Sequence, residues 1–362
     1  MDGKPRPKRI LALDGGGLRG VASLAFLERL EAKLKAEHGP ELRLHEYFDL
    51  VGGTSTGAII ATSIALGLTL EETKGHYFRL APNVFRRQWR RVPFLRALFS
   101  AEALHAEFQQ IMGDRTLDTP DLKTGLAIIA KRFDTGSVWF LTNNPKARYW
   151  NDSEGTIGNR RYSLANVVRA STAAPHFFDP QLIQIAEGQA PGLFVDGGVS
   201  PYNNPSLALL QIATIPAYGY GWKPGIGELD ITSIGTGTFR HRVGNLSFLA
   251  RLAAPFAVQA LRSMMADNDA LVLTMMQSLG RSETPWVTNS EVGDLNNVCI
   301  AGAPLFTFRR YDILLENWWL KEKIGRTVPE ELLPKLRDMS SLDTMQLIYE
   351  LAQEAAKQQI PI

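Results

Sequence analysis

The sequence predicts an α/β protein with a sheet that helices cover on both faces. The main observation is that short apolar runs ending in glycine alternate with segments whose apolar residues recur at helical spacing. The 362 residues are enough to bury a sizeable core, and 45% hydrophobic with 21% charged residues is typical of a soluble globular chain. A formal net charge of +2 gives no reason to expect a nucleic-acid polymer as a partner.

The first unit along the chain is a buried strand at residues 9–13, a glycine turn and a helix. Apolar residues recur from Val21 to Leu34 at helical spacing, and Gly39 with Pro40 ends that helix. Further strands are expected at residues 47–53, 126–133, 137–143, 192–198 and 229–237. Further helices are expected at residues 58–68, at 163–175 with Pro175 closing the segment, and at 256–279 and 341–359. The pattern turns helical after about residue 240, and residues 239–245 are the best boundary.

The sequence contains few features that would indicate targeting, membrane insertion or metal binding. Cys299 is the single cysteine, which excludes an intramolecular disulfide, disfavours a thiolate metal cluster and fits a reducing cytoplasm. The basic start of the chain runs into a glycine motif without the apolar core of a signal peptide. The apolar stretch from Ala58 to Leu70 is too short to span a bilayer. We therefore expect a cytoplasmic protein that contacts membranes only peripherally and needs no metal or other cofactor.

Three short motifs carry the chemistry. In "LALDGGGLRG", Gly15, Gly17 and Gly20 have the spacing of a dinucleotide-binding turn. In "GGTSTGA", Ser55 is the centre of a G-x-S-x-G sequence between a strand and a helix, the pattern of a nucleophile elbow, although a helix-capping turn would look similar. In "FVDGGVSPYNNP", Asp196 ends a strand, and alone it would pass for an ordinary Asp-Gly turn.

Read together, the motifs favour acyl transfer over dinucleotide binding. A dinucleotide-binding unit needs an acidic residue closing the next strand, but here that strand leads to Ser55, and Asp14 would be a poor neighbour for a pyrophosphate. A serine hydroxyl can attack an ester carbonyl, and the N–H groups of Gly15, Gly16 and Gly17 can form an oxyanion hole. Partial burial would raise the pKa of Asp196 and make it a better base.

"DGGGLRG", "GTSTG" and "DGG", in this order, resemble the three signatures of the patatin-like phospholipase family over roughly residues 8–210. The resemblance implies a three-layer α/β/α fold with a mainly parallel sheet. It implies that residues 211–362 hold the remaining sheet elements and a helical C-terminal region, a candidate lid or regulatory part. It also implies a Ser-Asp dyad without histidine, in which Ser55 is the nucleophile, Asp196 the general base, and Gly15, Gly16 and Gly17 the oxyanion hole. The other motif positions are Arg19, Gly20, Gly53, Gly57, Gly197 and Gly198.

The activity implied by this resemblance is release of fatty acids from membrane phospholipids through an acyl-serine intermediate. Similar bacterial members include antiphage effectors that cyclic nucleotides switch on, so a cyclic nucleotide is a candidate activator. Arg240, His241, Arg242 and Arg309 are candidate contacts for such an anion. Arg19, just inside the first helix, is either a phosphate or carboxylate contact or a structural residue. Oligomeric state is left open.

Two alternatives stay open. In a carboxylesterase with a Ser-Asp-His triad, His241 would complete the usual chain order after Ser55 and Asp196. A non-catalytic module would use the glycine turn to bind a nucleotide. Separately, residues 84–99 mix arginines with aromatic side chains, the pattern of a lid or of an interfacial segment, although a solvated arginine face over packed aromatics is equally consistent.

Overall fold

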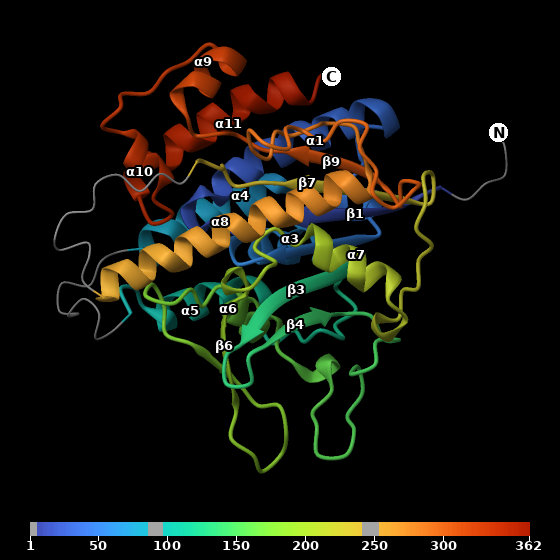
Figure 1. Cartoon of the computed structure of the whole chain (residues 1–362). Helices are drawn as coiled ribbons and strands as arrows, with labels where there is room; N and C mark the ends of the chain where they lie inside the picture. Colours follow the sequence, from blue (N-terminus) through green and yellow to red (C-terminus); the bar gives the residue numbers. More distant parts are fainter. Residues whose placement is uncertain (1–5, 86–96, 241–252) are drawn as a thin grey trace.

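The computed structural model, which describes residues 6–85, 97–240 and 253–362, contains one mixed sheet (Figure 1). The strand order within the described residues is β5-β6-β3-β2-β1-β7-β9-β8, with β4 beside β3. The pairs β3–β4, β3–β6 and β5–β6 are antiparallel and the others are parallel. The strands are β1 (Lys8–Leu13), β2 (Leu50–Thr54), β3 (Gly125–Arg132), β4 (Ser137–Thr142), β5 (Gln181–Ile183), β6 (Gly192–Asp196), β7 (Leu229–Ile234), β8 (Arg281–Ser282) and β9 (Thr307–Tyr311).

Helices pack on both faces of this sheet, as the sequence predicts, and give a three-layer α/β/α arrangement. The described helices are α1 (Gly20–His38), α2 (Leu44–Tyr47), α3 (Thr56–Ala65), α4 (Leu70–Val84), α5 (Ala101–Met112), α6 (Leu164–Ser171), α7 (Ser206–Thr214), α8 (Ala253–Leu279), α9 (Asn317–Ile324), α10 (Leu333–Arg337) and α11 (Met345–Gln359). α1, α3, α4, α5, α6 and α11 contribute to one hydrophobic cluster, and α7 and α8 contribute to the other.

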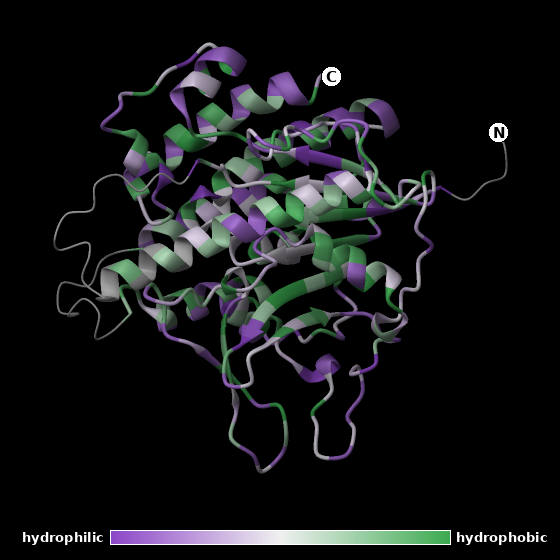
Figure 2. Ribbon diagram, viewed as in Figure 1, coloured by the Kyte–Doolittle hydropathy of each residue, from purple (hydrophilic) through white to green (hydrophobic). Residues whose placement is uncertain are grey.

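The side chains of β1 show why the sheet needs two covering layers. Leu11 and Leu13 belong to the first cluster, Ile10 and Ala12 belong to the second, and all four are fully buried. Alternate side chains of a strand point to opposite faces, so a strand that is apolar throughout must be covered on both. Figure 2 shows the same pattern in the central strands, which are mostly apolar, whereas polar residues lie on outer helices and loops.

The pairing of β3 brings the two motif-bearing turns together. β4 pairs with β3 along residues 127–132 on one edge, so β2 and β6 share the other edge. β2 runs parallel to β3 and ends with Thr54 opposite Ile129, whereas β6 runs antiparallel and ends with Asp196 opposite Ala130. The C-terminal ends of β2 and β6 therefore point at each other across adjacent residues of β3. The residue after β2 is Ser55.

Several elements differ from the sequence expectation. The helix expected at residues 163–175 ends as α6 at Ser171, four residues before Pro175. β9 lies in the region whose pattern is helical. Its sequence, TFRRY, does not look like a buried strand, because Arg310 would be expected to face solvent, but in the structure Arg310 is buried in an ion-pair network. β7 and β9 extend the sheet beyond β1, and α11 packs along α1. The division at residue 210 stays a prediction.

Candidate active site

Ser55 lies in a strained turn between β2 and α3. Its φ of 54° and ψ of −123° are outside the regions that side-chain-bearing residues prefer, at a typical cost of about 1–3 kcal/mol. The flanking glycines allow the tight turn: a Cβ on Gly53 would lie 2.1 Å from the carbonyl carbon of Gly57, and a Cβ on Gly57 would lie 2.1 Å from the carbonyl oxygen of Leu13. The local geometry is that of a nucleophile elbow, with the serine at the start of a helix.

A buried serine that the sequence analysis did not single out supports this turn. The backbone N–H of Ser55 donates to Ser171 Oγ at 2.9 Å, and that hydroxyl donates in turn to the carbonyl of Ile129 at 2.6 Å. Ser171 is fully buried at the end of α6. The elbow is thereby tied to β3, the strand on which β2 and β6 meet.

Asp196 lies beside Ser55 in the cavity that both residues line. Asp196 Oδ1 accepts the backbone N–H of Gly198 at 2.7 Å. Burial, at 4% exposure, raises the pKa of Asp196 to about 6, although the neighbouring Ser55 hydroxyl, the N–H of Gly198 and the charge of Arg169 act in the opposite direction. The carboxylate is therefore a stronger base than a free aspartate and is still ionised at neutral pH.

The glycine loop after β1 lies beside this pair. The N–H of Gly15 donates to the carbonyl of Asn203 at 3.1 Å, so it is already engaged. The carbonyl of Gly17 accepts the hydroxyl of Tyr77, and the N–H of Leu18 donates to Met339 at 2.8 Å. No described residue accepts a hydrogen bond from the N–H of Gly16 or Gly17. These two N–H groups are the ones left to face a bound ligand.

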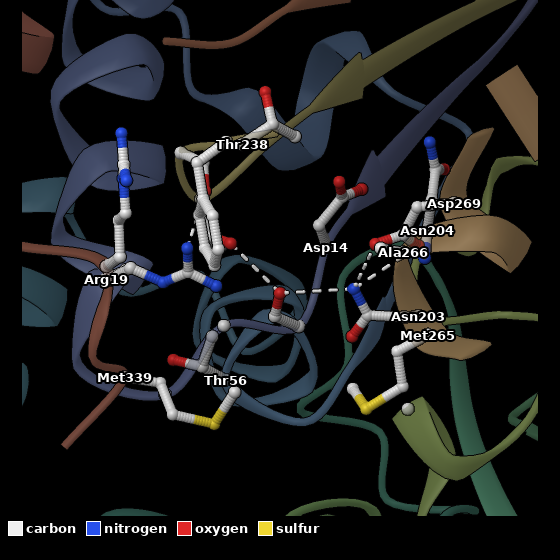
Figure 3. A pocket seen from close by; sticks show the side chains of 18 of the residues that line it. Asp14, Arg19, Thr56, Asn203, Asn204, Thr238, Met265, Ala266, Asp269 and Met339 are labelled. Atoms are coloured by element: carbon white, nitrogen blue, oxygen red, sulfur yellow. Dashed lines mark hydrogen bonds between the residues drawn. The ribbon is translucent and has the colours of Figure 1, made fainter. Parts of the chain in front are cut away.

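Arg19 is held inside the protein. Its side chain is 8% exposed, its Nη1 donates to the carbonyl of Gly237 at 2.8 Å, and its guanidinium stacks over the ring of Phe239 at 5.3 Å. It thus connects the glycine loop to the loop after β7. Figure 3 shows Arg19 and Thr56 on one side of the pocket, with Asn203 and Asp269 on the other.

Ser55, Asp196 and the glycine loop line one cavity of about 1380 Å³. That volume exceeds the roughly 300–1,000 Å³ of typical small-molecule pockets. One wall is apolar and includes Ile59, Leu80, Phe85, Leu104, Phe177 and Phe178. His176 also lines the cavity, and its ring lies against that of Phe177. A cavity of this size and character is suited to a long apolar substrate.

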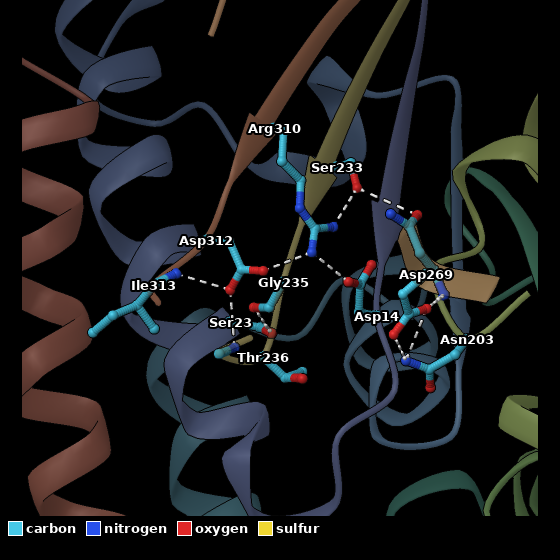
Figure 4. A network of polar contacts seen from close by, with 12 residues as sticks. Asp14, Ser23, Asn203, Ser233, Gly235, Thr236, Asp269, Arg310, Asp312 and Ile313 are labelled. Atoms are coloured by element: carbon cyan, nitrogen blue, oxygen red, sulfur yellow. Dashed lines mark hydrogen bonds and ion pairs between the residues drawn. The ribbon is translucent and has the colours of Figure 1, made fainter. Parts of the chain in front are cut away.

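An ion-pair network surrounds Asp14, the residue that precedes the glycine loop. Arg310 Nη2 lies 2.6 Å from Asp14 and 2.7 Å from Asp312, and Nη1 donates to Ser233 at 2.8 Å (Figure 4). Burial, together with the charges of Asp269 and Asp312, raises the pKa of Asp14 to about 7, although Arg310 acts in the opposite direction. Two carboxylates raise the pKa of the Arg310 guanidinium, against the effect of its own burial.

Replacing Arg310 with methionine is expected to lower the free energy of unfolding by about 3–5 kcal/mol, because Asp14 and Asp312 would be left buried without their partner. Urea unfolding measures this change. The matched control is Arg309→Met on the same strand. Arg309 is a half-exposed residue paired with Glu283, and its loss should cost less than about 1 kcal/mol. Equal losses in the two variants would contradict the role assigned to the network.

The structure accounts for only some of the other residues that the sequence suggests. His241, Arg242 and residues 86–96 are outside the described residues, so neither the triad nor most of the interfacial segment has a structural account. Arg240 is exposed, stacks over Trp318 at 5.3 Å and lines the same cavity as Ser55. Sequence reasoning assigned no role to Ser171, Asn203, Asp269 or Arg310. The clearest local signal for any of them is that Asn203 lies within the motif of Asp196, seven residues after this aspartate.

Comparison with known proteins agrees with this geometry. The family model described as "Patatin-like phospholipase" matches residues 11–210. The chain is 31% identical over 262 residues to a cUMP-AMP-activated phospholipase of Escherichia coli, covering 72% of this chain and 74% of that protein. It is 29% identical over 215 residues to a cGAMP-activated phospholipase of E. coli strain TW11681, covering 58% and 56%. It is 27% identical over 245 residues to patatin group J-1 of Solanum tuberosum, covering 63% and 60%.

The family match covers more than half of the chain and includes the strands and turns that carry Ser55, Asp196 and the glycine loop. The relatives named above as phospholipases are ester hydrolases. This chain belongs to the patatin-like phospholipase family of hydrolases.

Proposed function

We propose that the chain is a serine lipid acyl hydrolase of the phospholipase A type, with Ser55 as nucleophile and Asp196 as general base. The observation that carries the proposal is that Ser55, in a nucleophile-elbow turn, and the buried Asp196 line the same large, partly apolar cavity. Asp196 accepts the proton of Ser55 Oγ while this oxygen attacks the ester carbonyl of a phospholipid. The N–H groups of Gly16 and Gly17, with Gly15 holding the loop, stabilise the oxyanion.

The later steps use the same groups in reverse order. Protonated Asp196 returns its proton to the alkoxide of the leaving lysophospholipid, which leaves an acyl-Ser55 ester. A water molecule then loses a proton to Asp196 and attacks this ester, and the collapse of the second tetrahedral intermediate returns the proton to Ser55 and releases the fatty acid. Because Asp196 takes the proton of Ser55 directly in this proposal, the route needs no histidine.

The experiment that tests the activity is fatty-acid release from vesicles of mixed phospholipids, with mass spectrometry of the products. We expect free fatty acid and lysophospholipid in equal amounts in the initial steady state. Vesicles that yield neither product and short-chain esters that are not cleaved, both with and without a panel of cyclic dinucleotides, would contradict the proposal.

Catalysis is expected to require ionised Asp196. Because the pKa of Asp196 is raised to about 6, kcat/KM should fall about tenfold per pH unit below that value and level off above it. A soluble short-chain nitrophenyl ester measures this profile without vesicles. An acidic limb that is retained in Asp196→Asn but disappears in His241→Ala would instead favour the triad with histidine.

The substrate is proposed to be taken from a membrane surface. Among the described helices, none combines the length and apolar character needed to cross a membrane. Phe85 and Phe99, at the two ends of the segment expected to be interfacial, meet edge to face with their ring centroids 5.0 Å apart, and Phe85 also lines the cavity. Co-sedimentation with anionic and neutral vesicles tests the peripheral contact.

A cyclic dinucleotide is proposed as an activator, and this would fit a role in antiviral defence. The support is that two relatives are named as activated by cUMP-AMP and by cGAMP. Fatty-acid release should rise when the matching cyclic dinucleotide from a panel is added. Wild-type release that is unchanged across the whole panel would contradict the activation and leave the hydrolase proposal standing.

A further inference from the structure

We propose that Asp269, on α8, is a positioning residue for the oxyanion hole, which it orients through Asn203. The inference rests on the proposed function, because it assumes that Ser55 performs acyl transfer beside the glycine loop. Asp269 lies outside residues 11–210, the part that the family model matches.

The contacts of Asp269 converge on one turn. Its Oδ2 accepts Asn203 Nδ2 at 3.1 Å, and its Oδ1 accepts the same nitrogen at 3.4 Å and the backbone N–H of Asn204 at 3.2 Å (Figures 3 and 4). Asn203 and Asn204 are 9% and 2% exposed. They end the loop that begins with Asp196. Asp269 therefore fixes the far end of the loop that carries the proposed base.

Asn203 in turn forms hydrogen bonds with both the N–H and the carbonyl of Gly15. Its carbonyl accepts the N–H of Gly15 at 3.1 Å, and its Nδ2 donates to the carbonyl of Gly15 at 3.5 Å. Thr236 Oγ1 donates to the same carbonyl at 2.9 Å. The space is tight, since a Cβ on Gly15 would lie 2.4 Å from Asn203 Oδ1.

The consequence for catalysis follows from the geometry of the peptide bond. The carbonyl of Gly15 and the N–H of Gly16 belong to one planar trans unit, in which they point in opposite directions. Anchoring the oxygen therefore aims the N–H. Asp269 orients Asn203 Nδ2, this nitrogen anchors the carbonyl of Gly15, and the N–H of Gly16 is directed at the position of the developing oxyanion.

The placement of the acid on α8 supports this role. Met265, one turn before Asp269, lies against the turn after the base, with its Cε 3.3 Å from where a Cβ would stand on Gly198. Burial raises the pKa of Asp269 to about 6, although the hydrogen bonds that Asn203 and Asn204 donate lower it. Keeping the ionised carboxylate at this position therefore costs free energy. Asp267, the other acid of α8, is exposed and bonds to none of these groups.

The test compares Asp269→Ala and Asp269→Asn with the matched control Asp267→Ala. It measures kcat and KM on a soluble nitrophenyl ester. It also measures binding of a trifluoromethyl ketone, which forms an oxyanion adduct with the serine, and of an ether-linked phospholipid, which has no reacting carbonyl. We expect Asp269→Ala to lower kcat about tenfold to a hundredfold with KM nearly unchanged. Affinity for the ketone should fall by a similar factor, while affinity for the ether lipid stays at the wild-type value.

Asp269→Asn keeps the volume and one acceptor, but its NH₂ group faces Asn203 Nδ2, so we expect a smaller loss with the same division between kcat and KM. If the alanine variant fails to fold, the asparagine variant provides the test. Wild-type kcat and ketone affinity in the variants would overturn the inference, and so would equal loss of ketone and ether-lipid binding, which indicates a general structural defect. A wild-type protein that neither cleaves the ester nor binds the ketone, with and without a panel of cyclic dinucleotides, would overturn the proposed function itself.

Discussion

Replacing Ser55 with alanine is expected to lower kcat for fatty-acid release from phospholipid vesicles by about 10⁴-fold or more. The proposed mechanism has no other nucleophile, so without Oγ no acyl-enzyme forms. The fold should persist, because the contact that secures the elbow uses the backbone N–H of residue 55, which donates to Ser171 Oγ and remains in the variant. Fatty acid quantified by mass spectrometry gives the rate, and circular dichroism with thermal unfolding reports the fold.

The control for this substitution is Ser153→Ala. Ser153 is an exposed serine in a loop, away from the residues that line the cavity. It should release fatty acid at the wild-type rate. Release that persists in Ser55→Ala, with the same products and lipid preference, would mean that another group performs the attack.

Replacing Asp196 with asparagine is expected to lower kcat about 10³- to 10⁴-fold, since an amide cannot take the proton of Ser55. The turn itself should survive, because the asparagine Oδ1 can still accept the N–H of Gly198, as Asp196 Oδ1 does at 2.7 Å. The measurement is kcat on a soluble ester between pH 4 and pH 9. The acidic limb near pH 6 should vanish from the residual activity of this variant.

Removing the carboxylate also removes a costly buried charge, so the melting temperature of Asp196→Asn at neutral pH should equal or exceed the wild-type value. An inactive variant that is also partly unfolded would leave the base assignment unsupported. A well-folded variant with near wild-type kcat would contradict it.

The parts of the site that the sequence predicts are those encoded by short-range patterns. Gly53 and Gly57 indicate a tight turn around Ser55. In the structure both glycines lie so close to neighbouring backbone atoms that a Cβ would not fit at either position. The run of apolar residues in β1 indicates a strand buried on both faces. The pattern also places Asp196 at a strand end, where its burial, seen in the structure, raises its pKa.

The parts that the sequence does not predict depend on long-range pairing. Ser55 and Asp196 meet because β6 runs antiparallel along β3 while β2 runs parallel to it, and no local pattern gives that register. From the sequence alone, Arg310 would be taken for a surface residue. In the structure its Nη2 lies 2.6 Å from Asp14, which is 296 residues away along the chain. The engagement of the Gly15 N–H by Asn203, which leaves Gly16 and Gly17 as the proposed donors, is equally a tertiary contact.

The most direct test of the Ser55–Asp196 dyad is to trap the nucleophile. The wild-type protein is reacted with an alkyl fluorophosphonate, digested, and mapped by tandem mass spectrometry, beside Ser55→Ala and Asp196→Asn. The dyad predicts one phosphonyl group on Ser55 in the wild type, none in Ser55→Ala, and a much slower reaction in Asp196→Asn. An adduct on a different residue, or labelling of Ser55 at the wild-type rate in Asp196→Asn, would contradict it.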